Sequence, residues 1–375
     1  MNKNKNYYPA IILLLVGIIT ALSWLHVVDS ASSGAAQQFV KKGQTENIYH
    51  WKMVTSWPKN FPGLGGAPER FAEKVKAMSN GRLTVTVYGG GELVPALGVF
   101  DAVSQGTTEM GHTAAYYWKG KIPSAPFFTS VPFGMNAQEM NAWLHYGGGM
   151  ALWQEVYAPF NVIPLAGGNT GVQMAGWFNK EINTVDDLSG LKMRIPGVGG
   201  EVFKRAGGTA VTLPGGELYT SLQTGVIDAT EWVGPYNDMA MGLHEVAKYY
   251  YYPGWHEPGP TLELLVNKDA FNTLPKDLQA IVEVAARYAN QDMLDEYTAR
   301  NNAALLSLQE EHNVELRRLP DEVIEVLKKA SDDYIADVIA SDATAKKVYK
   351  SWKTFAEGAK NYHRVSERAY INARE

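Results

Sequence analysis

The 375-residue sequence predicts an α/β protein of two lobes, and three observations lead to this fold class. Short β-like runs alternate with amphipathic helical patterns from residue 49 onward, which is typical of helices that cover mixed or parallel sheets. A similar alternation returns in the middle of the chain, so we expect two such units with a cleft between them. One uninterrupted helical pattern at 274–310 then follows, and it is too long for a single lobe.

The first unit is predicted to run strand, helix, strand, helix, strand. In its second strand, leucine and valine alternate with threonine, the period of a strand that buries one face. Its first helix starts at a proline and is followed by Asn-Gly, which commonly ends a helix. The five elements are expected at 49–55, 68–78, 83–87, 95–104 and 109–113.

The second unit has the same kinds of element. Its second helix is followed by Gly225, a residue suited to the end of a helix. Strands are expected at 172–178, 192–195 and 226–230, and helices at 185–188 and 217–223.

The long helical pattern starts at Leu274-Pro275 and continues to about Glu310 without a breaker. A helix of this length extends about 50 Å, which is more than the width of one lobe. We therefore expect it to connect lobes or subunits.

The N-terminal residues 1–35 read as a targeting segment outside the fold. Lys3 and Lys5 precede an apolar run at 10–25, and small residues at 33–35 offer a cleavage site. An apolar run extended to residue 28 would just span a thin bilayer, so an uncleaved membrane anchor is the alternative. Both interpretations predict an exported, periplasmic protein.

The composition excludes several classes of function. The sequence contains no cysteine, which rules out disulfides, thiolate metal sites, a thiol nucleophile and a lipoprotein anchor. Its 34 basic and 39 acidic residues give a net charge of -5, which does not favour binding to nucleic acid. The common hydrolase, zinc-protease and phosphate-loop motifs do not occur. Small molecules are therefore the expected partners.

Three charged residues are candidates for a binding site. Arg194 lies between apolar neighbours at the end of a predicted strand, where it can hold a carboxylate through two hydrogen bonds or form a structural ion pair. Glu231 follows another strand, so it is a candidate ligand, a helix cap or a solvated charge. Glu257 lies in a Pro/Gly-rich turn that restricts its backbone, and carboxylate oxygens suit Na⁺ or Ca²⁺.

The histidines alone do not predict a metal site. Only His244-Glu245 and His256-Glu257 place a histidine beside a glutamate. Because neighbouring residues of a strand point to opposite faces, neither pair is expected to bind a metal by itself.

The stretches around these candidates resemble one family. Four of them are similar to the solute receptors of tripartite ATP-independent periplasmic (TRAP) transporters: GVQMAGW (171–177), LKMRIP (191–196), LPGGELY (213–219) and LQTGVIDATE (222–231). The resemblance extends from about residue 49 to about residue 338. Two further stretches are most similar to the 2-oxoacid and lactate receptors, EWVGPY (231–236) and PGWHEPG (253–259).

The resemblance implies a periplasmic binding protein fold, with a hinge between two lobes and a long helix that spans both. It divides the chain into a first lobe of 49–171 plus about 260–300 and a second lobe of 172–259 plus about 301–340. Residues 341–375 are expected to form a C-terminal helical tail. Trp352 and Phe355 in this tail are expected to be unburied, which leaves a homodimer open.

The resemblance also implies the roles of individual residues. Arg194 matches the arginine that holds the ligand carboxylate, and Tyr117 is the candidate contact from the first lobe. The ligands of a bridging Na⁺ or Ca²⁺ are expected to be Gln173, Glu231, the backbone carbonyl of Trp232, and Glu257. Gln173 and Trp232 are also expected to contact the substrate.

The sequence departs from the wider family at two positions. Many members carry a second arginine where Gln173 stands and an aromatic residue near Gly215. A bound cation would restore the charge that Gln173 lacks, and this balance favours a short 2-oxo or 2-hydroxy monocarboxylate such as pyruvate, another α-keto acid or lactate. The expected activity is binding without catalysis, followed by delivery to TRAP membrane subunits.

Three alternatives remain at this point. A receptor of the same family for C4-dicarboxylates is one, and a receptor of an ATP-driven transporter is another. An exported metal-dependent enzyme that uses Glu231 and Glu257 as acid and base is the third.

Overall fold

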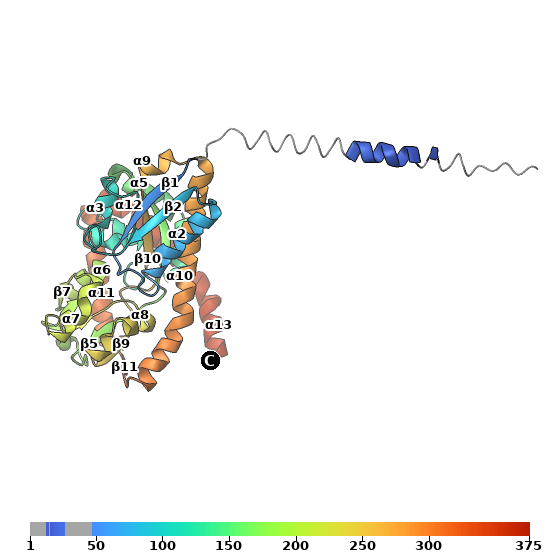
Figure 1. Cartoon of the computed structure of the whole chain (residues 1–375). Coiled ribbons are helices and arrows are strands. Elements are labelled where there is room, and N and C mark those ends of the chain that lie inside the picture. The colour runs from blue at the N-terminus through green and yellow to red at the C-terminus, as the bar shows by residue number, and fades with distance from the viewer. Residues whose placement is uncertain (1–12, 15, 27–46) are drawn as a thin grey trace, which may run out of the picture. The chain divides into compact units, whose positions relative to one another are not determined.

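The computed structural model describes residues 13–14, 16–26 and 47–375, which form two separate units, 1–48 and 49–375. In the first unit the described residues 13–14 and 16–26 are helical (Figure 1). The proposed cleavage site at 33–35 lies outside the described residues. Within the part of the chain that the structure describes, no helix is both long and apolar enough to cross a membrane.

The second unit contains two mixed β-sheets, which confirms the predicted α/β class (Figure 1). We call the five-stranded sheet with its covering helices the first lobe. Its strand order is β2 (Leu83–Tyr88), β1 (Tyr49–Thr55), β3 (Met110–Thr113), β10 (Thr261–Asn267) and β4 (Val162–Asn169). β1 is parallel to β2 and β3, whereas β10 is antiparallel to both of its neighbours. The helices of this part are α2 (Gly66–Met78), α3 (Val99–Ser104), α4 (Ala137–Tyr146), α5 (Gly149–Tyr157) and α9 (Lys268–Thr273).

The six-stranded sheet and its helices form the second lobe. Its strand order is β11 (Glu315–Arg318), β9 (Tyr249–Tyr252), β5 (Gly176–Phe178), β8 (Ala229–Thr230), β6 (Lys192–Arg194) and β7 (Thr209–Val211). The short helices of this part are α6 (Gly197–Arg205), α7 (Leu218–Gln223) and α8 (Pro235–Ala240). Parallel pairing of β6 with β7 and β8 puts the carboxyl ends of these three strands at one edge. The residue boundaries that the sequence predicts for the two lobes stay a prediction.

Several elements differ from the sequence prediction. The helix expected at 95–104 begins only at Val99, because Pro95 and Gly98 form a turn. The strand expected at 172–178 is confined to Gly176–Phe178, and that expected at 226–230 to Ala229–Thr230. The remaining residues of both segments are loops. These loops carry or flank the candidate site residues.

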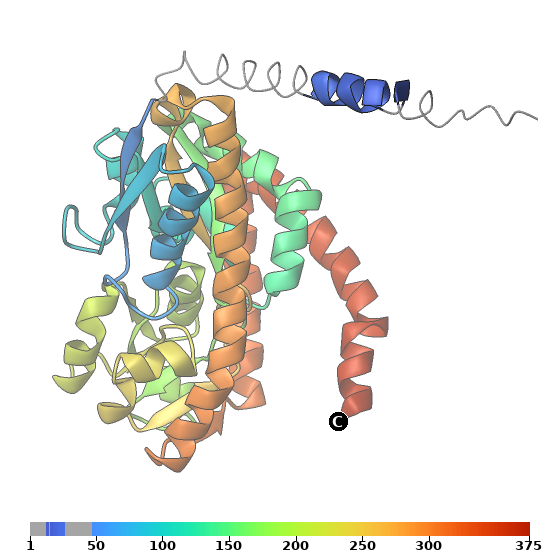
Figure 2. The ribbon, with the colours of Figure 1, turned by 45° about the vertical axis from the view of Figure 1, so that its right-hand side comes forward.

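The long helix is α10 (Lys276–Glu310), 35 residues, as predicted (Figure 2). Its first half packs on β4 and α2 and contributes Leu278 and Val282 to the apolar core beneath the first sheet. Its second half contacts α8 and contributes Tyr297 and Leu308 to a core that also contains second-lobe residues. The helix therefore spans both lobes.

The C-terminal segment consists of α11 (Asp321–Ser341), α12 (Ala343–Val365) and α13 (Glu367–Arg374). The expectation that Trp352 is unburied is wrong, because α12 packs on α4 and α5 and leaves this side chain 6% exposed. Phe355 is half-buried for the same reason. The exposed apolar side chains lie further along, at Tyr362, Val365, Tyr370 and Ile371, where the chain leads away from the sheets (Figure 2).

Candidate ligand-binding site

Four segments of the second lobe meet where this lobe faces the first. Arg194 is the last residue of β6, and Glu231 directly follows β8, its parallel neighbour. Gln173 lies in the loop before β5, and Glu257 lies in the loop between β9 and β10. All four side chains are buried. The fold thus brings together residues that are far apart in the sequence.

Arg194 is almost completely buried, with 1% of its surface exposed. Its Nη1 forms an ion pair with the carboxylate of Glu231 and also donates to the Glu231 carbonyl at 3.2 Å. Its Nε donates to the carbonyl of Leu213 at 3.1 Å. Nη2 is buried and has no partner. The guanidinium thus makes a structural ion pair and still presents one donor for a ligand.

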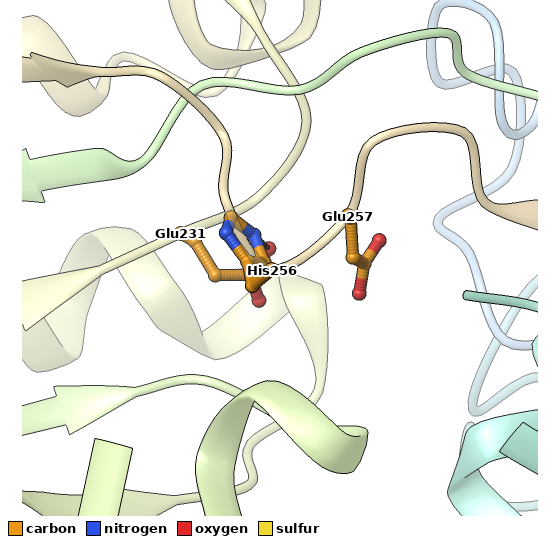
Figure 3. A group of neighbouring side chains, drawn as sticks. All are labelled: Glu231, His256 and Glu257. Carbon is orange, nitrogen blue, oxygen red and sulfur yellow. Dashed lines mark hydrogen bonds and ion pairs between the residues drawn. The ribbon is translucent and has the colours of Figure 1, made fainter. Parts of the chain in front are cut away.

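Glu231 connects Arg194 to a histidine that the sequence analysis did not select. Its second carboxylate oxygen lies 3.3 Å from Nε2 of His256. Glu231, His256 and Glu257 (Figure 3) each place one ligand atom within 4.8 Å of the others, and all three are buried. His256 and Glu257 lie in a loop rather than on a strand, so the expectation that they point to opposite faces does not apply. The Pro/Gly-rich sequence around them was the signal in the sequence that could have indicated this loop.

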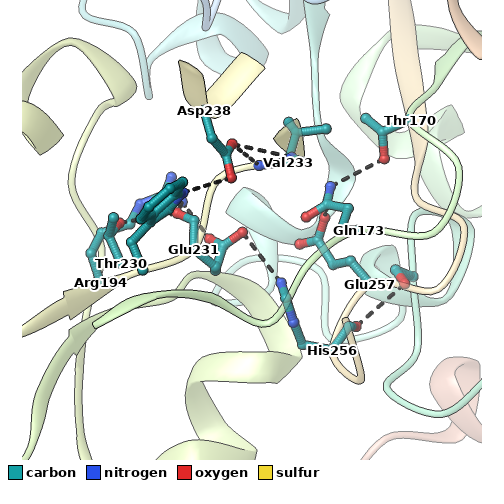
Figure 4. Close-up of polar contacts among 12 residues, drawn as sticks. Thr170, Gln173, Arg194, Thr230, Glu231, Val233, Asp238, His256 and Glu257 are labelled. Atoms are coloured by element: carbon teal, nitrogen blue, oxygen red, sulfur yellow. Dashed lines mark hydrogen bonds and ion pairs between the residues drawn. The ribbon is translucent and has the colours of Figure 1, made fainter. Parts of the chain in front are cut away.

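Gln173 is fixed so that one of its atoms stays free. Its Nε2 donates to Thr170 Oγ1 at 3.1 Å and to the Glu257 carboxylate at 2.8 Å (Figure 4). Its Oε1 is therefore turned away from both contacts, and it is buried without a partner. A Cβ on Gly254 would lie 2.0 Å from the Gln173 carbonyl oxygen, so this close approach of the two loops requires glycine.

Glu257 lies in an environment that disfavours its charge. Burial raises the pKa of Glu257 well above the usual value, and the neighbouring Glu231 raises it further, while Arg194 acts in the opposite direction. A carboxyl group in this state gains most from a nearby positive ion. The ligands expected from the sequence, Gln173 Oε1, two carboxylates and a backbone carbonyl, are all oxygen atoms, which would suit a hard cation such as Na⁺ or Ca²⁺.

Three of the site residues, Gln173, Arg194 and Glu257, line a small, partly open cavity between the lobes. Tyr117 lines it, as expected. The sequence analysis missed five other residues that line the cavity from the first lobe and the end of β4: Trp57, Leu64, Tyr116, Thr170 and Leu262. Trp57 had one usable signal, since it follows the carboxyl end of a predicted strand.

Trp232 contributes its indole to the cavity wall. The ring is 6.2 Å from that of Trp57 at an interplanar angle of 77°, an edge-to-face contact between the two lobes. A Cβ on Gly215 would lie 2.3 Å from this indole, so the ring of Trp232 fills the space above that glycine. The Trp232 Nε1 is buried without a partner.

A larger hollow lies beside α10, but several of its charged side chains are already paired with one another. Arg70 pairs with both Asp292 and Glu296, and the hydroxyl of Tyr236 donates to Glu296 at 3.2 Å. Around the smaller cavity, by contrast, Arg194 and Gln173 keep unpaired polar atoms. The smaller cavity is therefore the better candidate for a binding site.

The two-lobed fold is that of a periplasmic solute-binding protein. The family described as bacterial extracellular solute-binding protein, family 7 (DctP), matches residues 53–342, and the chain belongs to this family. It is 50% identical over 322 residues, 86% of this chain and 88% of the relative, to a monocarboxylate 2-oxoacid-binding periplasmic protein of Nostoc sp..

Three solved TRAP solute-binding proteins are similar in structure. A protein of Colwellia psychrerythraea with bound calcium and pyruvate and one of Pseudoalteromonas atlantica with bound sodium and pyruvate are each 46% identical, with TM-scores of 0.85. Each match covers 87% of this chain, and 100% and 99% of those chains. A protein of Bordetella bronchiseptica, a dimer with calcium and picolinate in its occupied site, is 38% identical with a TM-score of 0.86, over 87% of this chain and 97% of that chain. These matches confirm the predicted family and fold class.

Proposed function

We propose that the protein is the solute-binding subunit of a TRAP transporter and captures a short 2-oxo or 2-hydroxy monocarboxylate together with a cation. The observation that carries this proposal is the pair of unpaired atoms at one small cavity, Arg194 Nη2 and Gln173 Oε1. The arginine supplies a donor for a carboxylate, and the glutamine oxygen supplies a ligand for a cation. The pyruvate-bound relatives with calcium or sodium support this assignment.

The charges of the site favour a monocarboxylate. With both carboxylates ionised, Arg194, Glu231 and Glu257 sum to one negative charge, and a bound monocarboxylate makes two. A divalent cation neutralises this sum, and a monovalent one leaves a single negative charge. A dicarboxylate would add another buried negative charge, which is costly without a second cationic side chain. Gln173 stands where such a side chain would be needed.

The cation ligands in this proposal are Gln173 Oε1, the carboxylates of Glu231 and Glu257, and the main-chain carbonyl of Trp232. The aromatic walls from Trp57, Tyr117 and Trp232 exclude water when the lobes close, which strengthens the charged contacts. Binding therefore draws the lobes together, provided that the ligand has the higher affinity for the closed form.

The test is a thermal-shift and calorimetric screen of purified protein against pyruvate, 2-oxobutyrate, lactate and succinate, each with calcium, sodium or chelator. A ligand that binds only the native state raises the melting temperature. We expect the largest shift with a 2-oxo or 2-hydroxy monocarboxylate plus a cation. A response to succinate alone, without dependence on a cation, would refute the proposed ligand class.

The site is proposed to bind without catalysis. Arg194 and His256 both contact Glu231, and the proposal gives this carboxylate a role in binding the cation rather than in proton transfer. Prolonged incubation with pyruvate and calcium should return unchanged pyruvate by NMR. Any product would instead favour the metal-dependent enzyme.

We further propose export to the periplasm, delivery of the ligand to TRAP membrane subunits, and a homodimer. The exposed apolar side chains Tyr362, Val365, Tyr370 and Ile371 support the homodimer, as does the dimeric relative. Light scattering of the protein from residue 49 should give twice the monomer mass, and replacement of these four residues by serine should reduce it to the monomer mass. A monomer mass for the unmodified protein would refute the homodimer.

A further inference from the structure

Behind the cavity wall, a buried carboxylate of α8 holds the loop that carries Trp232. Asp238 is 1% exposed. Its Oδ1 accepts from the backbone N–H groups of Val233 and Gly234, both at 3.1 Å (Figure 4). Its Oδ2 accepts from Trp177 Nε1 at 3.0 Å and from the Tyr250 hydroxyl at 2.7 Å. All four groups donate hydrogen bonds to the Asp238 carboxylate.

The two side-chain donors fix Asp238 to the second sheet. Trp177 lies on β5 and Tyr250 on the adjacent β9, and their rings stack with centroids 4.0 Å apart. Both rings are completely buried. Asp238 therefore transmits the position of the sheet to the loop at 232–234. A single carboxylate does this because it accepts bonds on both of its oxygens.

The contact with Val233 also sets the direction of the Trp232 carbonyl. The N–H of Val233 and the C=O of Trp232 belong to one peptide unit, which is planar and trans. In such a unit the two groups point in opposite directions, so a bond that fixes the N–H also fixes the C=O. Among the described residues, no backbone group donates to the Trp232 carbonyl oxygen. That oxygen is therefore available for a cation.

We propose that Asp238 is a positioning residue that directs the main-chain carbonyl of Trp232 to the cation. The inference rests on the proposed function, because it needs a cation at this site. Asp238 does not touch the cation or the substrate. Its contribution is to keep one ligand oxygen in place before the cation arrives, in the way that residues behind metal ligands generally do.

The test uses two variants and a matched control. Asp238→Ala removes all four contacts, whereas Asp238→Asn keeps an oxygen for the two backbone N–H groups and changes only the side facing Trp177 and Tyr250. Tyr251→Phe is the control, since it removes the acceptor of a different buried backbone N–H, that of Ile182 at 2.8 Å, in the same lobe. Calorimetry measures the affinity for pyruvate at a series of calcium concentrations, and thermal melting checks that each variant is folded.

For Asp238→Ala we expect the affinity for calcium to fall about 10- to 100-fold. The affinity for pyruvate should then be weak at low calcium and return to the wild-type value at high calcium. Asp238→Asn should show a smaller loss with the same recovery, and it carries the test if Asp238→Ala does not fold. Tyr251→Phe should keep the calcium dependence of the wild type.

Two results would contradict the inference, and they are distinct. A loss of pyruvate affinity in Asp238→Ala that is the same at every calcium concentration would show that Asp238 acts only on the fold. An unaltered calcium affinity in both folded Asp238 variants would show that the carbonyl needs no such support. If the wild-type protein bound pyruvate without any cation dependence, the proposed function would itself fail, and the inference with it.

Discussion

The two walls of the cavity differ in what their polar atoms do. In the first lobe, the Trp57 indole donates to Nδ1 of His112 at 2.7 Å, and His112 Nε2 contacts the Gly167 carbonyl at 3.1 Å. Burial lowers the pKa of His112 to about 4, so this ring is neutral and its contacts are internal to the lobe. In the second lobe, Arg194 and Gln173 each keep a buried polar atom unpaired.

A second buried polar group of the first lobe also finds its hydrogen-bond partners within that lobe. Glu263 on β10 accepts from Trp118 Nε1 at 2.6 Å and from the Tyr157 hydroxyl at 2.9 Å. Trp118 belongs to the short 3₁₀ helix Ala115–Trp118, which also carries Tyr117. The first lobe thus satisfies these polar groups itself. The second lobe leaves one buried polar atom of Arg194 and one of Gln173 without a hydrogen bond, and the proposed binding of ligand and cation uses these two atoms.

The largest loss of ligand affinity is expected for Arg194→Ala, which changes the wall of the second lobe. The change removes the donor for the ligand carboxylate, and loss of one partner from a buried charge pair costs about 2–5 kcal/mol. We expect pyruvate affinity to fall about 30- to 5000-fold in calorimetry. Because the buried Glu231 loses its partner, Arg194→Ala/Glu231→Gln is needed as a control for stability. Wild-type affinity in a folded Arg194→Ala variant would disprove the assigned role.

The next largest effect is expected for Glu257→Gln. Loss of this charge removes one of the proposed cation ligands, so calcium affinity should fall roughly 10- to 100-fold, and pyruvate affinity at low calcium should fall with it. Glu245→Gln, an exposed position of the same lobe, is the matched control. Titrations of pyruvate with and without chelator make the comparison. Equal calcium dependence in Glu257→Gln and the control would exclude Glu257 as a ligand.

A smaller effect on pyruvate affinity is expected at Gly215, where the wall of the cavity is apolar. In Gly215→Ala the added methyl group would lie 2.3 Å from the Trp232 indole, so the ring must move into or away from the cavity. We expect a several-fold change in pyruvate affinity with little change in calcium affinity. Gly216→Ala is a close control, since a Cβ there meets no atom within 4 Å. Identical affinities in the two variants would show that the indole does not shape the site.

The smallest effect on binding, but a clear effect on stability, is expected for Glu263→Gln. Burial raises the pKa of Glu263 from 4.5 to about 8, so the folded state prefers the protonated carboxyl. That preference stabilises the fold fully below pH 4.5 and is lost as the pH rises through about 8. Glutamine does not titrate, so the melting temperature of the variant relative to wild type should rise between pH 5 and pH 8. A difference independent of pH would contradict the buried, protonated carboxyl.

Residues at strand ends were the most predictable part of the site. Arg194 ends one strand and Glu231 follows another, short-range patterns reveal both strands, and the carboxyl ends of parallel strands lie together. The long helix was predicted from its periodicity for the same reason, because its signal is local. The resemblance to TRAP receptors added Gln173 and the Trp232 carbonyl.

Features that depend on long-range pairing were not predictable in this way. β4 contains Pro164, Gly167 and Gly168, which read as loop residues, yet its pairing with β10 stabilises it as a strand. His256 was passed over because its segment was judged as a strand. Leu64 and Tyr116 line the cavity only because the two lobes contact each other there. No local sequence pattern predicts such a contact between lobes.

The edge-to-face pair of Trp57 and Trp232 joins two chromophores that belong to opposite lobes. Opening of the lobes separates the rings and admits water to both, so their fluorescence emission should shift to longer wavelength. Closure on a ligand should reverse that shift. With either ring changed to phenylalanine, the signal from the remaining eight tryptophans outside the pair, of ten in the sequence, serves as a reference. The protein thus carries its own optical probe of closure, which makes the rate of ligand capture measurable by stopped flow without an added label.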